Sequence, residues 1–207
     1  MPKGCLAKII LVVIITFTGL TVLVAGTYIG YILLQDGLKK QLNATNEELR
    51  SRAEQVADFS RIPPGYSVTK ALNLLSMKIV LASHPSNTQV MGIVDSGLIL
   101  NLNDENLTLQ TLEEKIKTLI SFINKQKNFK IDNFTVERLD SFRALNQTIP
   151  YMKVSFSILG EEKQEFIGII GIIKNTKTNK DNLIISYSSP NQYRQYVAER
   201  FFQKIEF

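Results

Sequence analysis

A run of 26 residues without a charged side chain, from Ile9 to Leu34, constrains this chain more than any other feature of its sequence. About 20 apolar residues in a helix suffice to cross the hydrocarbon layer of a bilayer. The apolar part of a cleaved signal peptide has only about 7–15 residues, so this run is too long for one. The sequence therefore predicts an uncleaved signal anchor, with a short tail over residues 1–8 and one transmembrane helix over residues 9–34.

The charges that flank the run predict its orientation. Lys3 and Lys8 precede it together with the free amino terminus, whereas Lys39 and Lys40 follow it and are partly offset by Asp36. The cytoplasmic flank of a membrane helix usually carries the greater positive charge. We therefore expect a single-pass membrane protein whose N-terminus is cytoplasmic and whose C-terminal domain is extracytoplasmic.

Two glycines within the run, Gly26 and Gly30, have the GxxxG spacing that lets two membrane helices approach closely. They are candidate contact residues of a helix dimer, although glycine is also common in membrane helices that do not dimerise. Self-association through the membrane helix is thus one expected contact of this chain.

The chain has one cysteine, Cys5, which lies before the apolar run. A single cysteine excludes an intrachain disulfide and a cysteine metal cluster. Its position also excludes a bacterial lipoprotein, in which the lipid-bearing cysteine follows the signal sequence, while palmitoylation of a juxtamembrane cysteine stays open.

Residues 35–62 have the composition of a helical stalk or linker. Apolar side chains recur there near heptad spacing, with charged residues between them, at Leu38, Leu42, Leu49, Val56 and Phe59. Such a helix can pair with a second copy. Pro63-Pro64-Gly65 should end it, because proline cannot donate a helix hydrogen bond and glycine accommodates the turn. We place the start of a soluble domain there, over residues 63–207.

The charge of this domain argues against nucleic acid as a partner. From Arg61 to the end there are 18 basic and 14 acidic residues, with the two signs interspersed. Nucleic-acid binding usually needs a concentrated basic stripe, and no basic run here exceeds two residues. The chain as a whole is 44% hydrophobic and 21% charged, which is typical of a folded protein and not of a disordered one.

Hydrophobic periodicity predicts the elements of the domain. Stretches rich in β-branched residues indicate seven strands, at 66–75, 77–82, 89–94, 134–144, 150–159, 165–174 and 183–188. Residues 107–126 instead carry apolar side chains at helical spacing, and a last helix should start with a capping box from Ser189 to Gln192. Residues 166–173 are apolar at every position, so this strand should be central. The expected class is α+β, with a mainly antiparallel sheet flanked by two helices.

This order of elements resembles that of the PsbP-type extrinsic subunit of photosystem II. Residues 166–173, 183–188 and the closing segment 193–207 chiefly carry the resemblance, which extends over residues 64–207. It implies an antiparallel sheet between helices, a C-terminal helix packed back on the sheet, and a binding or accessory role. No functional motif accompanies it, and a PsbP-type protein has no comparable membrane anchor.

Candidate catalytic chemistry is sparse. His84 is the only histidine, and with Asp95 and Ser96 it has the residue types of a serine–histidine–carboxylate catalytic set. No nucleophile motif supports such a set, so we do not expect catalysis there. Asp95-Ser96-Gly97 is similar to the aspartic-protease motif but has no second copy in the chain, and it is also a common turn. Gly168 and Gly171 lack the Gly-Lys-Ser/Thr of a phosphate loop, so we assign them to close helix packing.

These observations predict a non-enzymatic domain, without a cofactor or metal, that binds or helps assemble a membrane-associated protein. A second interpretation is a small-molecule or lipid sensor with an apolar ligand between helix and sheet. A third is a pilin-like filament subunit, because residues 1–4 resemble a short prepilin leader. That resemblance ends at Ile9, where the family pattern has a glutamate, and at Gly37, which interrupts the long helix.

Overall fold

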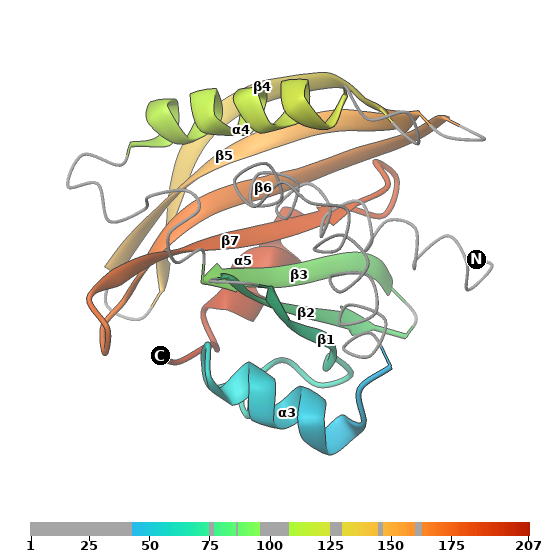
Figure 1. The fold of residues 1–207 in the computed structure, drawn as a ribbon. Coiled ribbons are helices and arrows are strands. Elements are labelled where there is room, and N and C mark those ends of the chain that lie inside the picture. Colours follow the sequence, from blue (N-terminus) through green and yellow to red (C-terminus); the bar gives the residue numbers. More distant parts are fainter. Residues whose placement is uncertain are drawn as a thin grey trace, which may run out of the picture.

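A computed structural model of the chain describes residues 43–74, 77–85, 87–95, 108–124, 130–144, 147–159 and 163–207. The described chain forms a seven-stranded antiparallel sheet and three helices, which confirms the α+β class (Figure 1). The predicted membrane helix, with Gly26 and Gly30, lies outside the described residues, as does Cys5.

The elements follow the predicted order. They are α3 (Asn46–Glu54), β1 (Ser67–Leu74), β2 (Met77–His84), β3 (Asn87–Asp95), α4 (Leu109–Ile123), β4 (Lys130–Ala144), β5 (Gln147–Leu159), β6 (Lys163–Asn175), β7 (Lys180–Ser188) and α5 (Gln195–Phe202). Each predicted strand and both predicted domain helices are present. The largest difference in strand bounds is in β4, which starts four residues before the predicted Phe134 and contains two irregularities in its pairing with β5.

The strands are arranged in the order β1-β2-β3-β7-β6-β5-β4, and every neighbouring pair is antiparallel. Two meanders, β1 to β3 and β4 to β7, therefore meet where β3 pairs with β7. The apolar strand β6 lies between β5 and β7, so its predicted interior position is confirmed. β1 and β4 are the edge strands.

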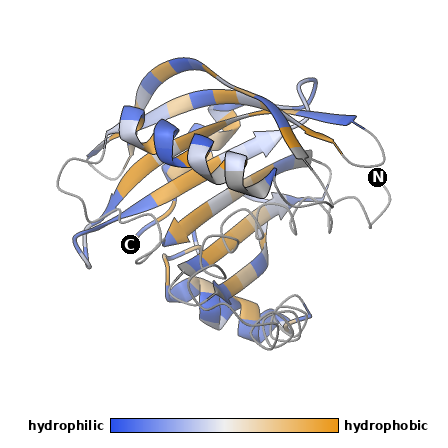
Figure 2. Cartoon of the chain, turned by 45° about the horizontal axis from the view of Figure 1, so that its top comes forward, coloured by the Kyte–Doolittle hydropathy of each residue, from blue (hydrophilic) through white to orange (hydrophobic). Residues whose placement is uncertain are grey.

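Helices pack on both faces of the sheet, and each face has its own hydrophobic core. α4 packs on one face over β4 and β5, through the buried Leu112 and Ile116. α3 and α5 contribute to the core on the opposite face. Because successive strand residues point to opposite faces, β7 supplies Ile185 to the first core and Ile184 to the second. Figure 2 shows hydrophobic residues concentrated along the strands.

The last helix begins later than predicted, and the capping box at Ser189 is wrong. Residues 190–192 form a turn in which the Gln192 N–H donates to the Ser189 carbonyl, and α5 starts only at Gln195. The fully buried amide of Gln89 on β3 explains this start. It accepts from the Arg194 N–H (3.0 Å) and donates to the Arg194 carbonyl (3.1 Å), which fixes the backbone just before the helix.

The assignment of Gly168 and Gly171 to helix packing is also wrong, because both glycines face neighbouring strands. A Cβ on Gly168 would lie 2.1 Å from the Ser186 carbonyl oxygen of β7. A Cβ on Gly171 would lie 2.8 Å from the Pro150 carbonyl oxygen of β5. These glycines permit a close approach between strands.

α3 is the described helix of the predicted stalk, and it lies against the domain. Ala53 of α3 and the following Val56 and Ala57 are buried in the core that α5 also forms. The C-terminus closes over this segment, because the Asp58 N–H donates to the Glu206 carbonyl at 2.6 Å and the Glu206 N–H donates back at 3.4 Å. Residues 46–58 are thus integrated into the folded domain, while residues 35–42 lie outside the described part of the chain.

Candidate functional site

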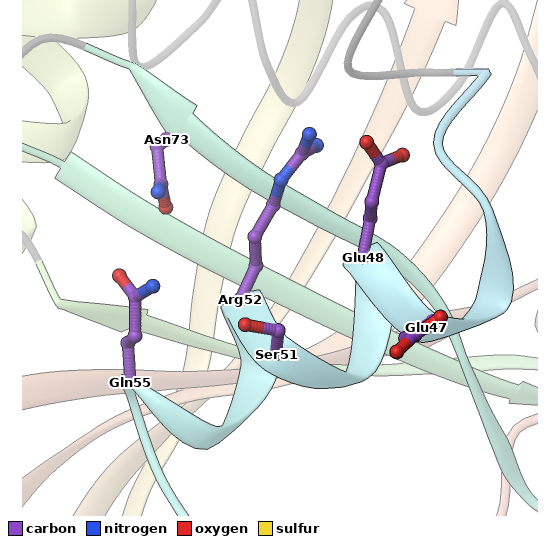
Figure 3. A pocket seen from close by; sticks show the side chains of 6 residues that line it. All are labelled: Glu47, Glu48, Ser51, Arg52, Gln55 and Asn73. Atoms are coloured by element: carbon purple, nitrogen blue, oxygen red, sulfur yellow. The ribbon is translucent and has the colours of Figure 1, made fainter.

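A polar groove of about 470 Å³ opens between α3 and the edge strand β1 (Figure 3). One face of α3 forms its wall, and β1 contributes one residue; the lining side chains are those of Glu47, Glu48, Ser51, Arg52, Gln55 and Asn73. Figure 3 shows the side chains of Glu48, Arg52 and Gln55 rising from the helix on the side of β1. We call this the α3 groove.

The start of α3 is fixed by a capping box. The Glu48 N–H donates to Thr45 Oγ1 (3.3 Å), and the Thr45 N–H donates to Glu48 Oε2 (3.0 Å). This reciprocal pair satisfies two of the backbone donors that a helix leaves unpaired at its N-terminus. The carboxylates at the mouth of the groove are therefore held on a defined helical turn.

Arg52 joins the helix to the edge of the sheet. Its Nη1 donates to the Ala71 carbonyl on β1 at 3.4 Å. Along an edge strand, the backbone N–H and C=O groups of one residue point to the partner strand, and those of the next residue point away from it. Because the Ala71 carbonyl accepts from Arg52, it points away from β2. The backbone groups of Asn73, two residues further along a regular stretch of β1, should face the same way. The groove therefore presents side chains of α3 beside outward backbone groups of β1.

The chemistry of the groove suits hydrogen bonding to a partner. Glu47 and Glu48 supply two carboxylates, Arg52 supplies a guanidinium, and the remaining lining side chains are two amides and a hydroxyl. Arg52 has five N–H donors, and one of them accounts for its bond to Ala71. This set offers side-chain hydrogen-bond donors and acceptors beside the edge of the sheet.

A second polar cluster lies where α5 meets β4 and β5. The Tyr151 hydroxyl accepts a hydrogen bond from Gln195 Nε2 at 2.6 Å, and the same amide donates to Glu199 Oε1 at 2.8 Å. Burial, with the nearby carboxylates of Asp140 and Glu199, raises the pKa of Tyr151 to about 12. The phenol is therefore neutral at physiological pH, and its role is to position α5 on the sheet.

The catalytic set considered for His84 is not brought together. His84 and Asp95 lie at opposite ends of the β2–β3 hairpin: Asp95 pairs with Lys78, and His84 is six residues from Lys78 along β2. At about 3.3 Å per residue this separates them by roughly 20 Å. His84 instead packs against Gly65 and makes an edge contact with Tyr66, whose ring centroid is 5.4 Å away.

The remaining predicted features are only partly covered by the structure. Ser96 and Gly97 lie outside the described residues, so the Asp95-Ser96-Gly97 motif stays untested. Within the described residues, no group of three or more histidine, cysteine, aspartate or glutamate side chains is placed to hold a metal ion. Likewise, no helix in the described part of the chain is long and apolar enough to cross a membrane.

Sequence reasoning did not identify the α3 groove. Its residues come from α3 and from β1. The packing of α3 against β1, which brings Asn73 beside the helix, cannot be read from the sequence of either segment. One local signal was present, because Thr45 and Glu48 have the spacing of a capping box and mark the start of a helix.

The fold and the groove together define an α+β domain with an antiparallel sheet between helices and a polar groove at one edge of that sheet. No protein-family model matches the chain, and no curated protein matches its sequence.

Proposed function

We propose that this chain is a single-pass membrane protein whose extracytoplasmic domain binds, or helps to assemble, a membrane-associated protein through the α3 groove. Residues 9–34 cross the bilayer in this proposal, with the N-terminus in the cytoplasm, and self-association through Gly26 and Gly30 is part of it. The domain acts by binding and not by catalysis.

The position of the α3 groove next to the anchor carries the proposal. α3 begins at Asn46, only 12 residues after Leu34, the last residue of the apolar run. Twelve fully extended residues reach at most about 40 Å, so the groove stays close to the bilayer surface. A partner that enters the groove would therefore be another protein at the same membrane.

The integration of α3 into the domain also supports this function. Ala53 is buried, Arg52 is bonded to β1, and Asp58 pairs with the C-terminal Glu206. A binding surface on such a fixed helix keeps its geometry, which lowers the entropic cost of association. The PsbP-type resemblance of the sequence likewise favours an accessory role.

Membrane topology is testable with the single cysteine as a natural reporter. We expect Cys5 to resist a membrane-impermeant maleimide added to the extracytoplasmic side of intact cells. In a Cys5→Ser background, Thr178→Cys should be labelled, because Thr178 lies in the exposed turn between β6 and β7. Labelling of Cys5 and not of residue 178 would reverse the proposed orientation, and equal labelling of both without permeabilisation would reject a membrane-spanning anchor.

Partner binding in the groove is testable by site-specific photocrosslinking in native membranes. A photoreactive amino acid at Ser51, which lines the groove, should give one adduct of defined size. The matched control is Glu54 of the same helix, which does not line the groove and pairs with Arg50. Arg52→Glu should abolish the Ser51 adduct, because it reverses the charge inside the groove. The proposal is rejected if positions 51 and 54 give the same adducts, or if neither gives any.

A further inference from the structure

The exposed side of α5 combines an aromatic ring with basic side chains. Tyr196 is 62% exposed although it is large and apolar over most of its surface. Arg200 follows one helical turn later, and Lys204 comes just after the helix ends; both are exposed. Gln203 donates from Nε2 to the backbone carbonyl of Arg143 (3.1 Å), which ties this end of α5 to β4. We call Tyr196, Arg200 and Lys204 the α5 patch.

The positive charge of the α5 patch is not neutralised by ion pairs. In the described part of the chain, neither of its two basic side chains takes part in an ion pair. The two nearest acidic residues on this segment have other partners: Glu199 accepts from Gln195, and Glu206 pairs with Arg61. The patch therefore presents two basic side chains, Arg200 and Lys204, beside one exposed aromatic ring.

The α5 patch lies on the same face of the sheet as α3, the first described helix after the proposed anchor. α3 and α5 pack against the same face of the sheet, and Glu206, two residues after Lys204, pairs with Asp58. Asp58 is only four residues beyond the end of α3. The chain between Leu34 and α3 is short, as shown above, so a bilayer at its far end lies within reach of this face.

We propose that the α5 patch rests on the bilayer and binds the headgroups of anionic phospholipids. Lysine and arginine close to an anionic membrane surface are attracted to it, and this attraction decays within about a Debye length. Tyrosine favours the headgroup region, because its ring is apolar and its hydroxyl is polar. The inference rests on the proposed membrane anchor, and it adds a fixed orientation in which the α3/α5 face of the domain is turned toward the lipid.

The absence of tryptophan from the chain allows a sharp test. Tyr196→Trp introduces a single fluorescent reporter at an exposed position. The full-length protein would be reconstituted in nanodiscs that contain brominated phosphatidylcholine, a contact quencher, at a constant fraction, with or without anionic phosphatidylglycerol. The matched control is Leu139→Trp, which replaces another exposed apolar residue, 45% exposed, on β4. Leu139 pairs with Met152, a member of the core under α4, and so points to the opposite face.

We expect quenching at position 196 to be roughly twofold stronger with the anionic lipid than without it, and to fall in 0.5 M salt. Replacing Arg200 and Lys204 together by glutamine should remove this dependence. Position 139 should show no such dependence. Equal quenching at both positions, or quenching at 196 that ignores the anionic lipid, would overturn the inference. Incorporation into nanodiscs and the labelling of Thr178→Cys report on the anchor separately, so failure of the patch and failure of the anchor remain distinguishable.

Discussion

Gly168→Ala is expected to lower the free energy of unfolding by about 3 kcal/mol or more, because the added methyl group has no space within the sheet. Gly168 lies on β6 opposite Tyr187 of β7, and the new Cβ would stand 2.1 Å from the Ser186 carbonyl oxygen. The obstructing atom belongs to the backbone, so no side-chain rotation relieves the overlap. β7 would have to move away from β6 at the centre of the sheet.

Gly92→Ala is the matched control for this substitution. A Cβ on Gly92 of β3 also meets close neighbours, at 2.7 Å and 2.8 Å, but these are side-chain atoms of Ile185 and Leu81. Side-chain atoms can adjust more readily than a strand carbonyl, so a smaller loss, of about 1–2 kcal/mol, is expected. Both variants would be compared by chemical denaturation followed by circular dichroism. Equal midpoints would show that the spacing of β6 and β7 is not limited by the Ser186 carbonyl.

Much of the fold could be read from the sequence because periodicity records which face of an element is buried. The helical spacing of Leu112 and Ile116 predicted α4, and both residues are buried in the core that α4 covers. The uninterrupted apolar sequence of β6 predicted a strand covered on both faces, and its residues are divided between the two cores. The pattern of apolar residues within one helix or strand was therefore sufficient to predict which of its faces are buried.

The rest could not be predicted, because it depends on residues that are distant in the chain. Gln89 determines where α5 begins, although it is 105 residues away from Arg194. Gly168 was assigned to helix packing because its sequence gives no indication that the neighbour is a strand carbonyl. These contacts depend on the pairing of β3 with β7 and of β6 with β7. No short stretch of the sequence indicates which strands pair.

The two surfaces proposed for binding were missed for the same reason. The α3 groove combines a face of α3 with Asn73 of β1, and the charge of the α5 patch depends on how nearby carboxylates pair in the folded domain. In the sequence, the basic residues are interspersed with acidic ones, and no concentrated stripe is visible. Only folding pairs Glu206 with the distant Arg61 and gives Glu199 a hydrogen bond from Gln195.

Removal of the last three residues, 205–207, is expected to destabilise the protein by about 4 kcal/mol or more and to release the segment around α3. Ile205 is fully buried and Phe207 is 9% exposed, and both belong to the core that contains Ala53 and Val56. Deletion also removes the two backbone hydrogen bonds between Glu206 and Asp58. The loss therefore combines a cavity in the core with unpaired backbone groups on the chain that leads to the anchor.

Hydrogen exchange would locate this loss, and Glu206→Gln provides its control. In the truncated protein, amides of residues 53–62 should exchange much faster than those of β6 and β7, because the C-terminus no longer covers them. Glu206→Gln removes only the exposed ion pair with Arg61 and keeps the backbone bridge, so a change within about 0.5 kcal/mol is expected. If truncation left exchange at residues 53–62 unchanged, the C-terminus would not hold this segment on the domain, and the α3 groove would need another source of rigidity. If Glu206→Gln alone reproduced the truncation, the ion pair and not the buried side chains would carry the contact.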